Sequence, residues 1–438
     1  MDSTFISLGV AKDLTDRLAQ LGITTPTPIQ AKAIPEAVAG RDVVGIAQTG
    51  TGKTLAFGLP VLHRLLEHHG KALIILPTRE LAEQVDTTLK ELGRPFGLRT
   101  SLIIGGAAMG AQILSLRRRP NVVVGTPGRI VDHMEKGTLR LTDVTILVLD
   151  EADRMLDMGF APQVNTILAG VPTSRQTLLF SATMPTAIER IAAAQLKNPT
   201  RVQLSATGSV ADNVTQELFV LAKSEKTALL AEHIRQNPGP VLVFTRTKHG
   251  ARKLCQTIQT FGQTAAEIHG NRSLAQRREA LQGFKNGRYH VLVATDVAAR
   301  GIDVTGIEMV INFDIPDQPE DYVHRIGRTA RAGCAGKAVS YAAPDQARLV
   351  QAIERLMRKS IPRSRSIQPN SISQPVSAPQ LGTQPVFTEF NDIRAMRWQQ
   401  EHSQQRQPQT QSAGRSNYGG RNGSRSGSQN RRPWRNRV

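Results

Sequence analysis

The stretch Ala47-Gln48-Thr49-Gly50-Thr51-Gly52-Lys53-Thr54 follows a short apolar run, Asp42–Ala47. Its glycines let backbone N–H groups turn toward anionic oxygens without a Cβ clash, and the loop leads into a helix whose N-terminus favours anions. Lys53 can reach the outer phosphates of a nucleoside triphosphate, and the Thr54 hydroxyl can bind Mg²⁺. The spacing predicts a phosphate-binding loop between a strand and a helix.

A second stretch, Asp150-Glu151-Ala152-Asp153, follows the apolar run Thr145–Leu149. Such a run predicts a strand buried on both faces, so the acidic residues should emerge at its carboxyl end. Asp150 suits Mg²⁺ coordination, and Glu151 is the candidate that orients and deprotonates an attacking water. Two surface acids that cap a helix are the alternative, which the phosphate loop makes the weaker one. Together the two stretches predict an enzyme that hydrolyses a nucleoside triphosphate.

Short apolar runs alternate with longer amphipathic stretches over most of the chain. This alternation is typical of βαβ units and therefore of an α/β fold with parallel sheets. In the first half the predicted strands are Asp42–Ala47, Ala72–Leu76, Ser101–Ile104, Val122–Gly125, Thr145–Leu149 and Thr177–Phe180. In the second half they are Val241–Thr245, Ala266–His269, His290–Ala294, Met309–Phe313 and Ala338–Tyr341, before a last helix over Asp345–Lys359.

The polar, glycine-containing stretch between Asn198 and Thr215 interrupts this pattern, so we interpret it as a linker between two domains. The predicted boundaries are a first domain at 1–205, a linker at 206–215, a second domain at 216–361 and a tail at 362–438.

The tail is rich in Ser, Gln, Pro, Gly, Asn and Arg. Such a segment buries too little apolar surface to offset its ordering entropy, so we expect disorder. The formal net charge of the chain is +19, and from residue 361 onward there are twelve Arg, no Lys and three acidic residues. This balance favours a polyanionic partner such as nucleic acid, with improved solubility as the alternative. An island in the tail could be a docking helix for a protein partner or a weakly adhesive linker; it contains Phe387, Phe390, Ile393, Met396 and Trp398.

The two cysteines, Cys255 and Cys334, lie far apart and have no partner at metal-ligand spacing. They support neither a zinc site nor a disulfide framework, which fits a reducing compartment. The N-terminus lacks an apolar signal-peptide core, and no apolar run approaches the ~18 residues of a membrane span. We therefore expect a cytoplasmic protein with no membrane partner.

The Asp-Glu-Ala-Asp stretch and the motifs around it, in their order, resemble the DEAD-box RNA helicases of superfamily 2 over residues 5 to about 360. Within that family, Arg154–Phe160 is most similar to the bacterial RhlE-type branch. The resemblance implies two RecA-like parallel-sheet domains in tandem, followed by the disordered basic tail. It also implies ATP and Mg²⁺ as cofactors, RNA as the partner, RNA-stimulated ATP hydrolysis and local, non-processive unwinding or remodelling.

The resemblance assigns the ATP site residue by residue. Pro26–Gln30 resembles the family's adenine-recognition motif, in which the Gln30 amide pairs with adenine and Phe5 stacks on it. Asp303 would contact the ribose, and His324–Arg331 matches the arginine-finger segment, with Arg328 and Arg331 at the γ-phosphate. The implied ATP-binding residues are Phe5, Gln30, Gln48, Thr49, Gly50, Thr51, Gly52, Lys53, Thr54, Asp303, Arg328 and Arg331. Those implied in catalysis are Glu151, Asp150, Lys53, Arg328 and Arg331, with Thr54 and Asp150 at the metal.

Ser181-Ala182-Thr183 resembles the family's coupling motif. Its hydroxyls are expected to hydrogen-bond the acidic cluster, especially Asp153, and so to link hydrolysis to domain closure. His324 belongs with this coupling group.

The RNA contacts are implied in the same way, by motifs that each follow a predicted strand. Backbone N–H groups, hydroxyls and arginines in such loops suit phosphate contacts that ignore base identity. The implied residues are Pro77, Thr78, Arg79, Gly105, Gly106, Thr126, Pro127, Gly128, Arg129, Arg246, Arg277 and Thr295. Two departures from the family's pattern stand out: Leu274 occupies the usual Gln position, and Ala330 replaces a common Gly.

Two other classes of function stay open from the residues alone. An ATP-gated RNA clamp or annealer in a larger assembly would use the same residues, and so would a translocase on DNA. A small GTPase is disfavoured, because no Asn-Lys-x-Asp guanine motif follows the phosphate loop.

Overall fold

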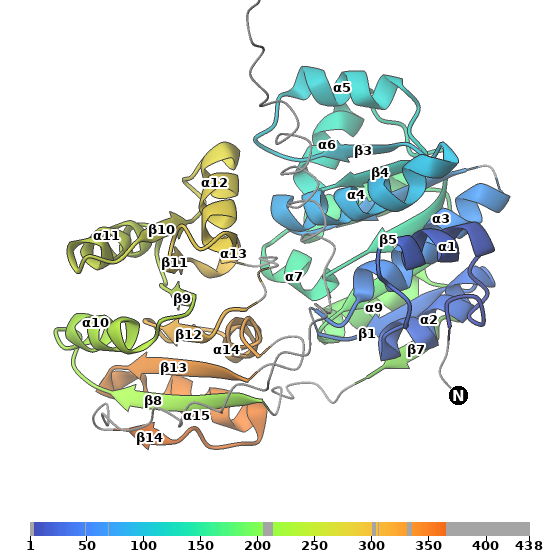
Figure 1. Cartoon of the computed structure of the whole chain (residues 1–438). Coiled ribbons are helices and arrows are strands. Elements are labelled where there is room, and N and C mark those ends of the chain that lie inside the picture. The colour runs from blue at the N-terminus through green and yellow to red at the C-terminus, as the bar shows by residue number, and fades with distance from the viewer. Residues whose placement is uncertain are drawn as a thin grey trace, which may run out of the picture. The chain divides into compact units, whose positions relative to one another are not determined.

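The computed structural model describes residues 4–48, 50–68, 70–204, 213–299, 304, 306–330 and 335–364 (Figure 1). Among the residues with a predicted role, Thr49, Asp303 and Arg331 lie outside the described part, as do Cys334 and the island at 387–398. The described residues form two seven-stranded sheets with helices on both faces.

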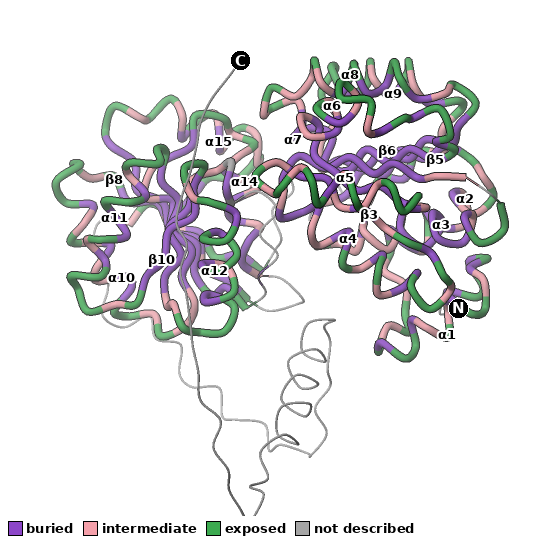
Figure 2. The backbone as a smooth tube through the Cα atoms, turned by 90° about the horizontal axis from the view of Figure 1, so that it is seen from above, coloured by how far each residue is buried: buried purple, intermediate pink, exposed green. Residues whose placement is uncertain are grey.

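All registered strand pairs of the first sheet are parallel, in the order β3-β4-β2-β5-β6-β1-β7. Its central strands are buried over nearly their whole length, which explains their runs of Val, Leu and Ile (Figure 2). The strands are β1 (Val43–Ile46), β2 (Lys71–Ile75), β3 (Thr100–Ile103), β4 (Val122–Gly125), β5 (Val144–Leu149), β6 (Gln176–Ser181) and β7 (Thr200–Gln203).

Helices cover both faces of this sheet because successive side chains of each strand point to opposite faces. On one face, Leu73 and Leu147 share a core with Ile130 and Met155, which belong to α6 (Pro127–Glu135) and α7 (Ala152–Asp157). On the other face, Phe57 packs on Phe180 with ring centroids 5.6 Å apart. The remaining helices are α1 (Lys12–Gln20), α2 (Pro28–Val38), α3 (Lys53–Glu67), α4 (Arg79–Gly93), α5 (Met109–Arg117), α8 (Ala161–Gly170) and α9 (Thr186–Gln195).

The second sheet is also parallel, in the order β10-β11-β9-β12-β13-β8-β14. Counted from its own first strand, this is the strand order of the first sheet, so the two domains share one topology. The strands are β8 (Val214–Val220), β9 (Val241–Phe244), β10 (Ala265–Ile268), β11 (Val291–Ala294), β12 (Met309–Asn312), β13 (Gly336–Ala342) and β14 (Arg363–Ser364). The helices are α10 (Lys226–Gln236), α11 (Lys248–Thr260), α12 (Leu274–Lys285), α13 (Asp296–Ala299), α14 (Pro319–Ile326) and α15 (Ala347–Met357).

The predicted strands of the sequence analysis are confirmed, each within two residues at either end. Three segments were interpreted wrongly. β7 lies in the polar stretch after Asn198, at the end of the predicted first domain, where no strand was predicted. The start of β8 lies within the predicted linker at 206–215, and β14 lies within the segment assigned to the disordered tail. β7 and β14 are short, polar edge strands, so they lack the apolar signal that identifies buried strands. The last helix begins at Ala347 rather than Asp345 and ends at Met357.

No helix of the described residues is both long enough and apolar enough to cross a membrane.

A buried histidine anchors one face of the second domain. His233 on α10 is 2% exposed and packs between Phe219 and Tyr341, with its Nδ1 atom 2.8 Å from the Tyr341 hydroxyl oxygen and 3.1 Å from the Leu229 carbonyl oxygen. Burial lowers the pKa of the His233 imidazole to about 4. The fold therefore holds this ring neutral.

We predict that the stability of the second domain falls as the pH drops from about 6.5 to about 4. In this window the unfolded chain binds a proton at residue 233 that the folded chain rejects, so the free energy of unfolding decreases by up to about 3 kcal/mol and then levels off. Urea unfolding of the whole chain at several pH values measures this. His233→Phe should flatten the pH dependence, whereas the exposed His249→Gln should not; equal slopes for both variants would contradict the assignment.

Candidate active site and RNA-binding edge

The phosphate loop has the backbone that the sequence predicts. Gly50 and Gly52 have φ of 89° and 91°, and Gly52 precedes the first residue of α3, Lys53. A Cβ on Gly52 would lie 2.5 Å from Nε2 of Gln30, so only glycine fits there. Gln30 Nε2 donates to the Gly52 carbonyl at 3.0 Å, and its Oε1 accepts the Thr27 N–H at 2.9 Å. Gln30 therefore ties the start of α2 to the phosphate loop.

Phe5 has no open ring face in this conformation, because it is only 1% exposed. Its predicted stacking on adenine therefore requires the ring to become uncovered.

The acidic stretch lies at the carboxyl end of β5, and its second residue contacts the phosphate loop directly. Lys53 Nζ lies 2.8 Å from Glu151 Oε1, with side chains 5% and 1% exposed. Arg154 Nε lies 3.1 Å from the other carboxylate oxygen of Glu151. Glu151 has φ of 54°, a left-handed backbone that costs a non-glycine residue about 1–3 kcal/mol. The surrounding charges thus hold a strained residue in place.

These contacts set opposite ionisation for the two neighbouring acids. Burial favours the neutral form of Glu151, but Arg154 and Lys53 outweigh it and hold the pKa of the carboxyl well below its usual range. Burial raises the pKa of the Asp150 carboxyl to about 7, against the opposing effect of Lys53. Asp150 Oδ1 accepts the Glu151 N–H at 2.9 Å, and within the described part of the chain its other oxygen has no protein donor. Asp150 is therefore a buried carboxylate with too few hydrogen-bond donors and too little positive charge around it to balance its burial.

The coupling motif makes the hydrogen bonds that the sequence predicts. The N–H and hydroxyl of Thr183 donate to Asp153 Oδ2 at 2.8 and 2.7 Å. Ser181 Oγ contributes differently, because it accepts the Asp153 backbone N–H at 3.2 Å. Asp153 is 2% exposed, so these donors satisfy a buried charge. The role of the motif in domain closure stays a prediction.

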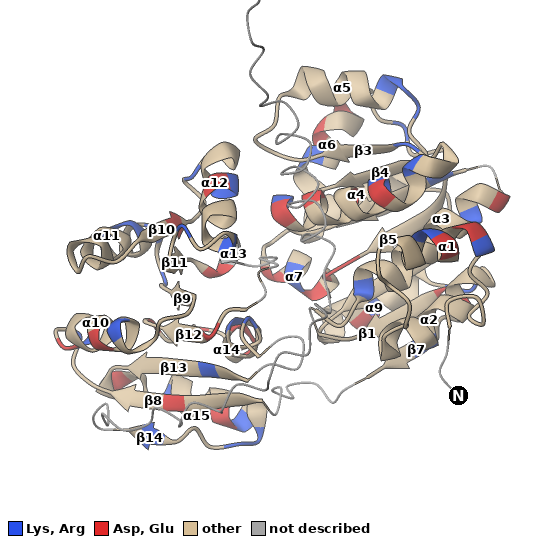
Figure 3. Ribbon diagram, in the orientation of Figure 1, with Lys and Arg blue, Asp and Glu red and all other residues tan. Residues whose placement is uncertain are grey.

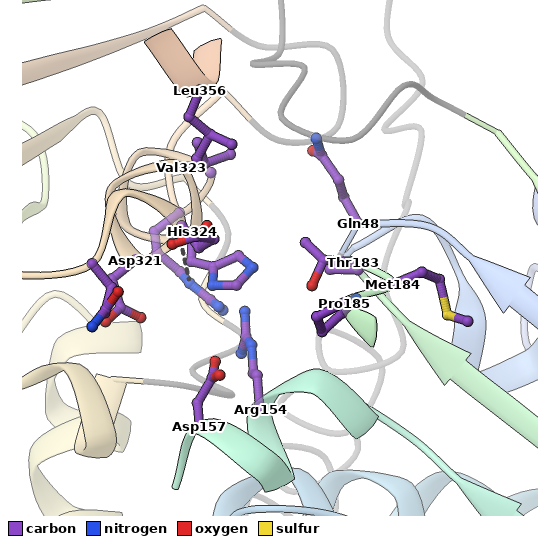
Figure 4. Close-up of a pocket in the computed structure, with 15 residues that line it drawn as sticks. Gln48, Arg154, Asp157, Thr183, Met184, Pro185, Asp321, Val323, His324 and Leu356 are labelled. Carbon is purple, nitrogen blue, oxygen red and sulfur yellow. Dashed lines mark hydrogen bonds between the residues drawn. The ribbon is translucent and has the colours of Figure 1, made fainter. Parts of the chain in front are cut away.

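A cavity of about 650 Å³ lies next to this cluster and is lined by residues of both domains (Figure 4). Thr183 and Arg154 line it from the first domain, and His324 and Arg328 line it from α14 and the residues after it. Arg328 is 3% exposed, and its Nε donates to the His324 carbonyl oxygen at 3.3 Å. Figure 4 shows Arg154 extending toward His324. The structure therefore brings the predicted arginine finger into the same cavity as the coupling motif.

The predicted RNA-contact residues of the first domain follow the carboxyl ends of β2, β3 and β4. Thr78 caps α4 by accepting the Leu81 N–H, and Thr126 precedes α6. A Cβ on Gly106 would lie 2.6 Å from Nη1 of Arg79, so the glycine backbone is packed closely against that guanidinium. Pro77 and Pro127 are buried, while Gly105, Gly106 and Gly128 are at least partly exposed. These residues lie together along one edge of the sheet, the edge at which the carboxyl ends of its strands meet.

Three arginines converge at this edge. Burial, then the like charges of Arg277 and Arg129, lower the pKa of the Arg79 guanidinium. Within the described residues Arg79 makes no hydrogen bond or ion pair with the protein. Arg129 donates from Nη1 to the Ala107 carbonyl at 3.0 Å and lies 3.2 Å from Asp132. Like charges held together by the fold favour an anionic ligand.

Arg277 has a partner that the sequence analysis did not anticipate. Its Nε lies 2.7 Å from Glu80 Oε1, and the side chains are 9% and 5% exposed. Arg278 forms a more exposed pair with Glu83, so two ion pairs link α12 of the second domain to α4 of the first. Figure 3 shows charged residues on both helices. Gln276 caps the start of α12 through Ser273: its Oε1 accepts the Ser273 N–H at 3.0 Å, and its own N–H donates to the Ser273 hydroxyl oxygen at 3.3 Å.

The other predicted contacts of the second domain lie at strand ends. Arg246 follows β9, is 45% exposed and bonds the Ile315 carbonyl and Asp317. Thr295 follows β11 and is half-buried. Between them, buried Arg325 binds both carboxylate oxygens of Asp296, at 2.5 and 2.7 Å, and fixes the carboxyl ends of β11 and β12 relative to α14.

Comparison with known proteins now decides the family. Residues 27–191 match the DEAD/DEAH box helicase model, and residues 225–333 match the helicase conserved C-terminal domain. The DEAD-box ATP-dependent RNA helicase CshA of Bacillus licheniformis is 43% identical over 369 residues, which cover 84% of this chain and 76% of that protein. The chain belongs to the DEAD-box helicase family.

Further relatives agree. The ATP-dependent rRNA helicase RRP3 of Yarrowia lipolytica is 42% identical over 363 residues, covering 82% of this chain and 75% of that protein. S. cerevisiae Dbp5 bound to RNA and ADP BeF3 superposes with a TM-score of 0.75 at 31% identity, covering 83% of this chain and 95% of Dbp5. Mss116p bound to ssRNA and AMP-PNP gives 0.77 at 28% identity, covering 84% and 80%. The two sheets with their flanking helices are thus tandem RecA-like domains of an ATP-hydrolysing RNA helicase.

The sequence analysis missed four buried residues that position the predicted ones. Arg154 and Glu80 pair with Glu151 and Arg277. Gln112 donates to the carbonyls of Ile104 and Ala107, and His133 contacts Gln112. The available signal was a charged or amide side chain inside a predicted helix. This signal does not show which residue the side chain contacts.

We predict that Thr183→Val destabilises the first domain by about 1–3 kcal/mol, because a buried carboxylate loses a hydroxyl donor while the side-chain shape is kept. Urea unfolding of the whole chain measures the change. Thr166→Val is the matched control, since that exposed hydroxyl only donates to a carbonyl of its own helix. Equal effects of the two substitutions would show that the Asp153 contact contributes nothing specific.

Proposed function

We propose that this helicase hydrolyses ATP with Glu151 as the water-activating base, Lys53 at the phosphates and Arg328 and Arg331 as arginine fingers from the second domain. The observation that carries this proposal is the buried ion pair of Lys53 with Glu151 beside a cavity that Arg328 also lines. Lys53 and Glu151 neutralise one another here, so phosphate oxygens that attract Lys53 would release Oε1 of Glu151 to accept a proton from water, while Arg154 still holds the other carboxylate oxygen.

The donor set at Asp150 fits Mg²⁺. A buried carboxylate whose pKa is raised by burial lacks compensating charge, and carboxylate and hydroxyl oxygens are the ligands that Mg²⁺ prefers. Asp150 and Thr54 would hold the ion, which would supply positive charge against the negative charge that develops on the phosphate oxygens. Arg328 would add stabilisation from the second domain, a contribution that reaches about 10³–10⁵ in rate in related phosphoryl transfers.

For RNA, we propose contacts to backbone rather than bases, by the residues at the edge formed after β2, β3 and β4 and by Arg246, Arg277 and Thr295. Support comes from the convergence of Arg79, Arg129 and Arg277. ATP and RNA would each favour the arrangement in which both domains contribute, so their binding should be positively coupled. Strand separation would then be local, with hydrolysis releasing the RNA.

The narrower assignments are also proposals. Arg154–Phe160 supports the RhlE-type branch, although the relatives reported above carry the names CshA and RRP3. The lack of zinc-type or paired cysteines supports a cytoplasmic location. The arginines of the tail at 362–438 support RNA binding by this tail, and the apolar island within the tail supports a protein partner.

We predict that single-stranded RNA stimulates ATP hydrolysis by about tenfold or more at ATP concentrations below KM, because a coupling free energy of about 1–3 kcal/mol between two ligands raises the affinity for ATP. Steady-state ATPase assays without nucleic acid, with RNA and with DNA of the same sequence measure this. Equal stimulation by DNA would favour a translocase on DNA. RNA stimulation of hydrolysis without duplex separation would favour a clamp or annealer.

We predict that Glu151→Gln lowers kcat of the RNA-stimulated reaction by about 100-fold or more, because the amide cannot accept a proton from water. Equilibrium binding of a fluorescent ATP analogue should persist, since Lys53 and the phosphate loop remain. The exposed Glu189→Gln is the control. A Glu151→Gln variant that keeps more than a tenth of the wild-type rate would remove Glu151 from the proposed role.

A further inference from the structure

A buried side-chain network supports the backbone of the loop between β3 and α5. Gln112 on α5 is 5% exposed, and its Nε2 donates to the carbonyl oxygens of Ile104 at 3.0 Å and Ala107 at 3.3 Å. Arg129 donates to the same Ala107 oxygen. Two peptide carbonyls of this loop are therefore turned toward the protein.

The orientation of the Gln112 amide is fixed by chemistry. Both hydrogens of its Nε2 are directed to carbonyls, which accept only, so Oε1 must accept. That oxygen lies 3.2 Å from Nε2 of His133, which must therefore carry a hydrogen. In the neutral ring Nδ1 of His133 accepts from the Thr138 hydroxyl at 2.8 Å, and this hydroxyl then does not donate to the His133 carbonyl oxygen 3.1 Å away. His133 is fully buried, and burial followed by the Arg129 charge lowers its pKa, which fits this neutral ring.

The carbonyl directions determine where the N–H groups of the loop point. In a trans peptide the C=O of one residue and the N–H of the next point in opposite directions, and the described chain contains no cis peptide. The N–H groups of Gly105 and Ala108 therefore point away from Gln112. Neither has an acceptor within the described residues, and both residues are at least partly exposed. They lie in a loop that Arg79 and Arg129 contact.

We propose that Gln112 and His133 are positioning residues for RNA: they hold the loop so that the N–H groups of Gly105 and Ala108 bind backbone phosphate together with Arg79 and Arg129. This inference rests on the proposed RNA-binding edge. If Gln112 and His133 served only the fold, their hydrogen bonds would not need to end on this loop, which is partly exposed and is contacted by Arg79 and Arg129. Gln112 and His133 thereby act on affinity for RNA and leave the ATP site unaffected.

The first domain contains a matched control for Gln112. Gln176 is also a buried amide, 6% exposed, whose Nε2 donates to two carbonyls, those of Ala37 and Arg41, both at 2.8 Å. It lies at the amino end of β6, whereas the loop follows the carboxyl end of β3. Gln112→Leu and Gln176→Leu therefore each remove two amide-to-carbonyl hydrogen bonds, at opposite ends of the strands of one sheet, and Gln112→Leu also removes the contact with His133.

The experiment compares these two variants in ATPase assays titrated with single-stranded RNA. Gln112→Leu should raise the RNA concentration for half-maximal stimulation by about tenfold, with unstimulated hydrolysis and the KM for ATP unchanged. Gln176→Leu should lower Tm to a similar extent and leave RNA half-saturation unchanged. His133→Leu should reproduce the RNA effect, and His133→Gln should restore it in part, because an amide nitrogen can donate to Gln112 Oε1.

The positioning role would be overturned if Gln112→Leu left the RNA concentration for half-maximal stimulation unchanged, or if Gln176→Leu raised that concentration equally. In either case, stimulation of the wild-type chain by RNA would leave the proposed function intact. If the wild-type chain showed no response to RNA, the proposed function would fail, and the positioning role with it.

Discussion

Parallel pairing of every strand is the constraint from which the site follows. The carboxyl ends of all strands in a parallel sheet lie at one edge, so any motif that directly follows a strand reaches that edge. In the first sheet, β5, β6 and β1 are consecutive neighbours, and they are followed by Asp150, the Ser181–Thr183 motif and the phosphate loop. β3, β4 and β2 form the other half and are followed by the RNA-contact motifs. Strand order thus divides one edge into a half with the proposed nucleotide contacts and a half with the proposed RNA contacts, which meet between β2 and β5.

The repeated topology extends this division to the second domain. β10, β11 and β9 correspond in order to β3, β4 and β2, and Arg246 and Thr295 follow two of them. Arg325 fixes the segments after β11 and β12 through Asp296 and Asn312, so the helix that precedes Arg328 is attached to the ends of the strands. Each domain therefore places its proposed RNA contacts and its proposed nucleotide contacts at the carboxyl ends of the strands of one sheet.

The sequence predicted the buried strands well because parallel strands covered on both faces are uninterrupted apolar runs, as at Val122–Gly125. It missed β7 and β14 for a related physical reason. Each is the last strand of its domain and the outermost strand of its sheet, next to the first strand of that domain, and both expose most of their polar side chains. Position in a motif predicted which residues reach the edge. It did not predict the buried partners that hold them, since Arg277 and Glu80 are separated by 197 residues and only the tertiary fold joins them.

The same pairing bears on how RNA could use Arg277. A buried ion pair that loses one partner costs about 3–5 kcal/mol, so Glu80 cannot simply be abandoned when a phosphate approaches. Arg79 and Arg129 resolve this difficulty, because their charges add to that of Arg277 and exceed what Glu80 neutralises. The surplus positive charge can attract a phosphate while Glu80 still holds Arg277 in place. Glu80 then keeps α12 against α4 and lets one guanidinium serve both the contact between the domains and the RNA.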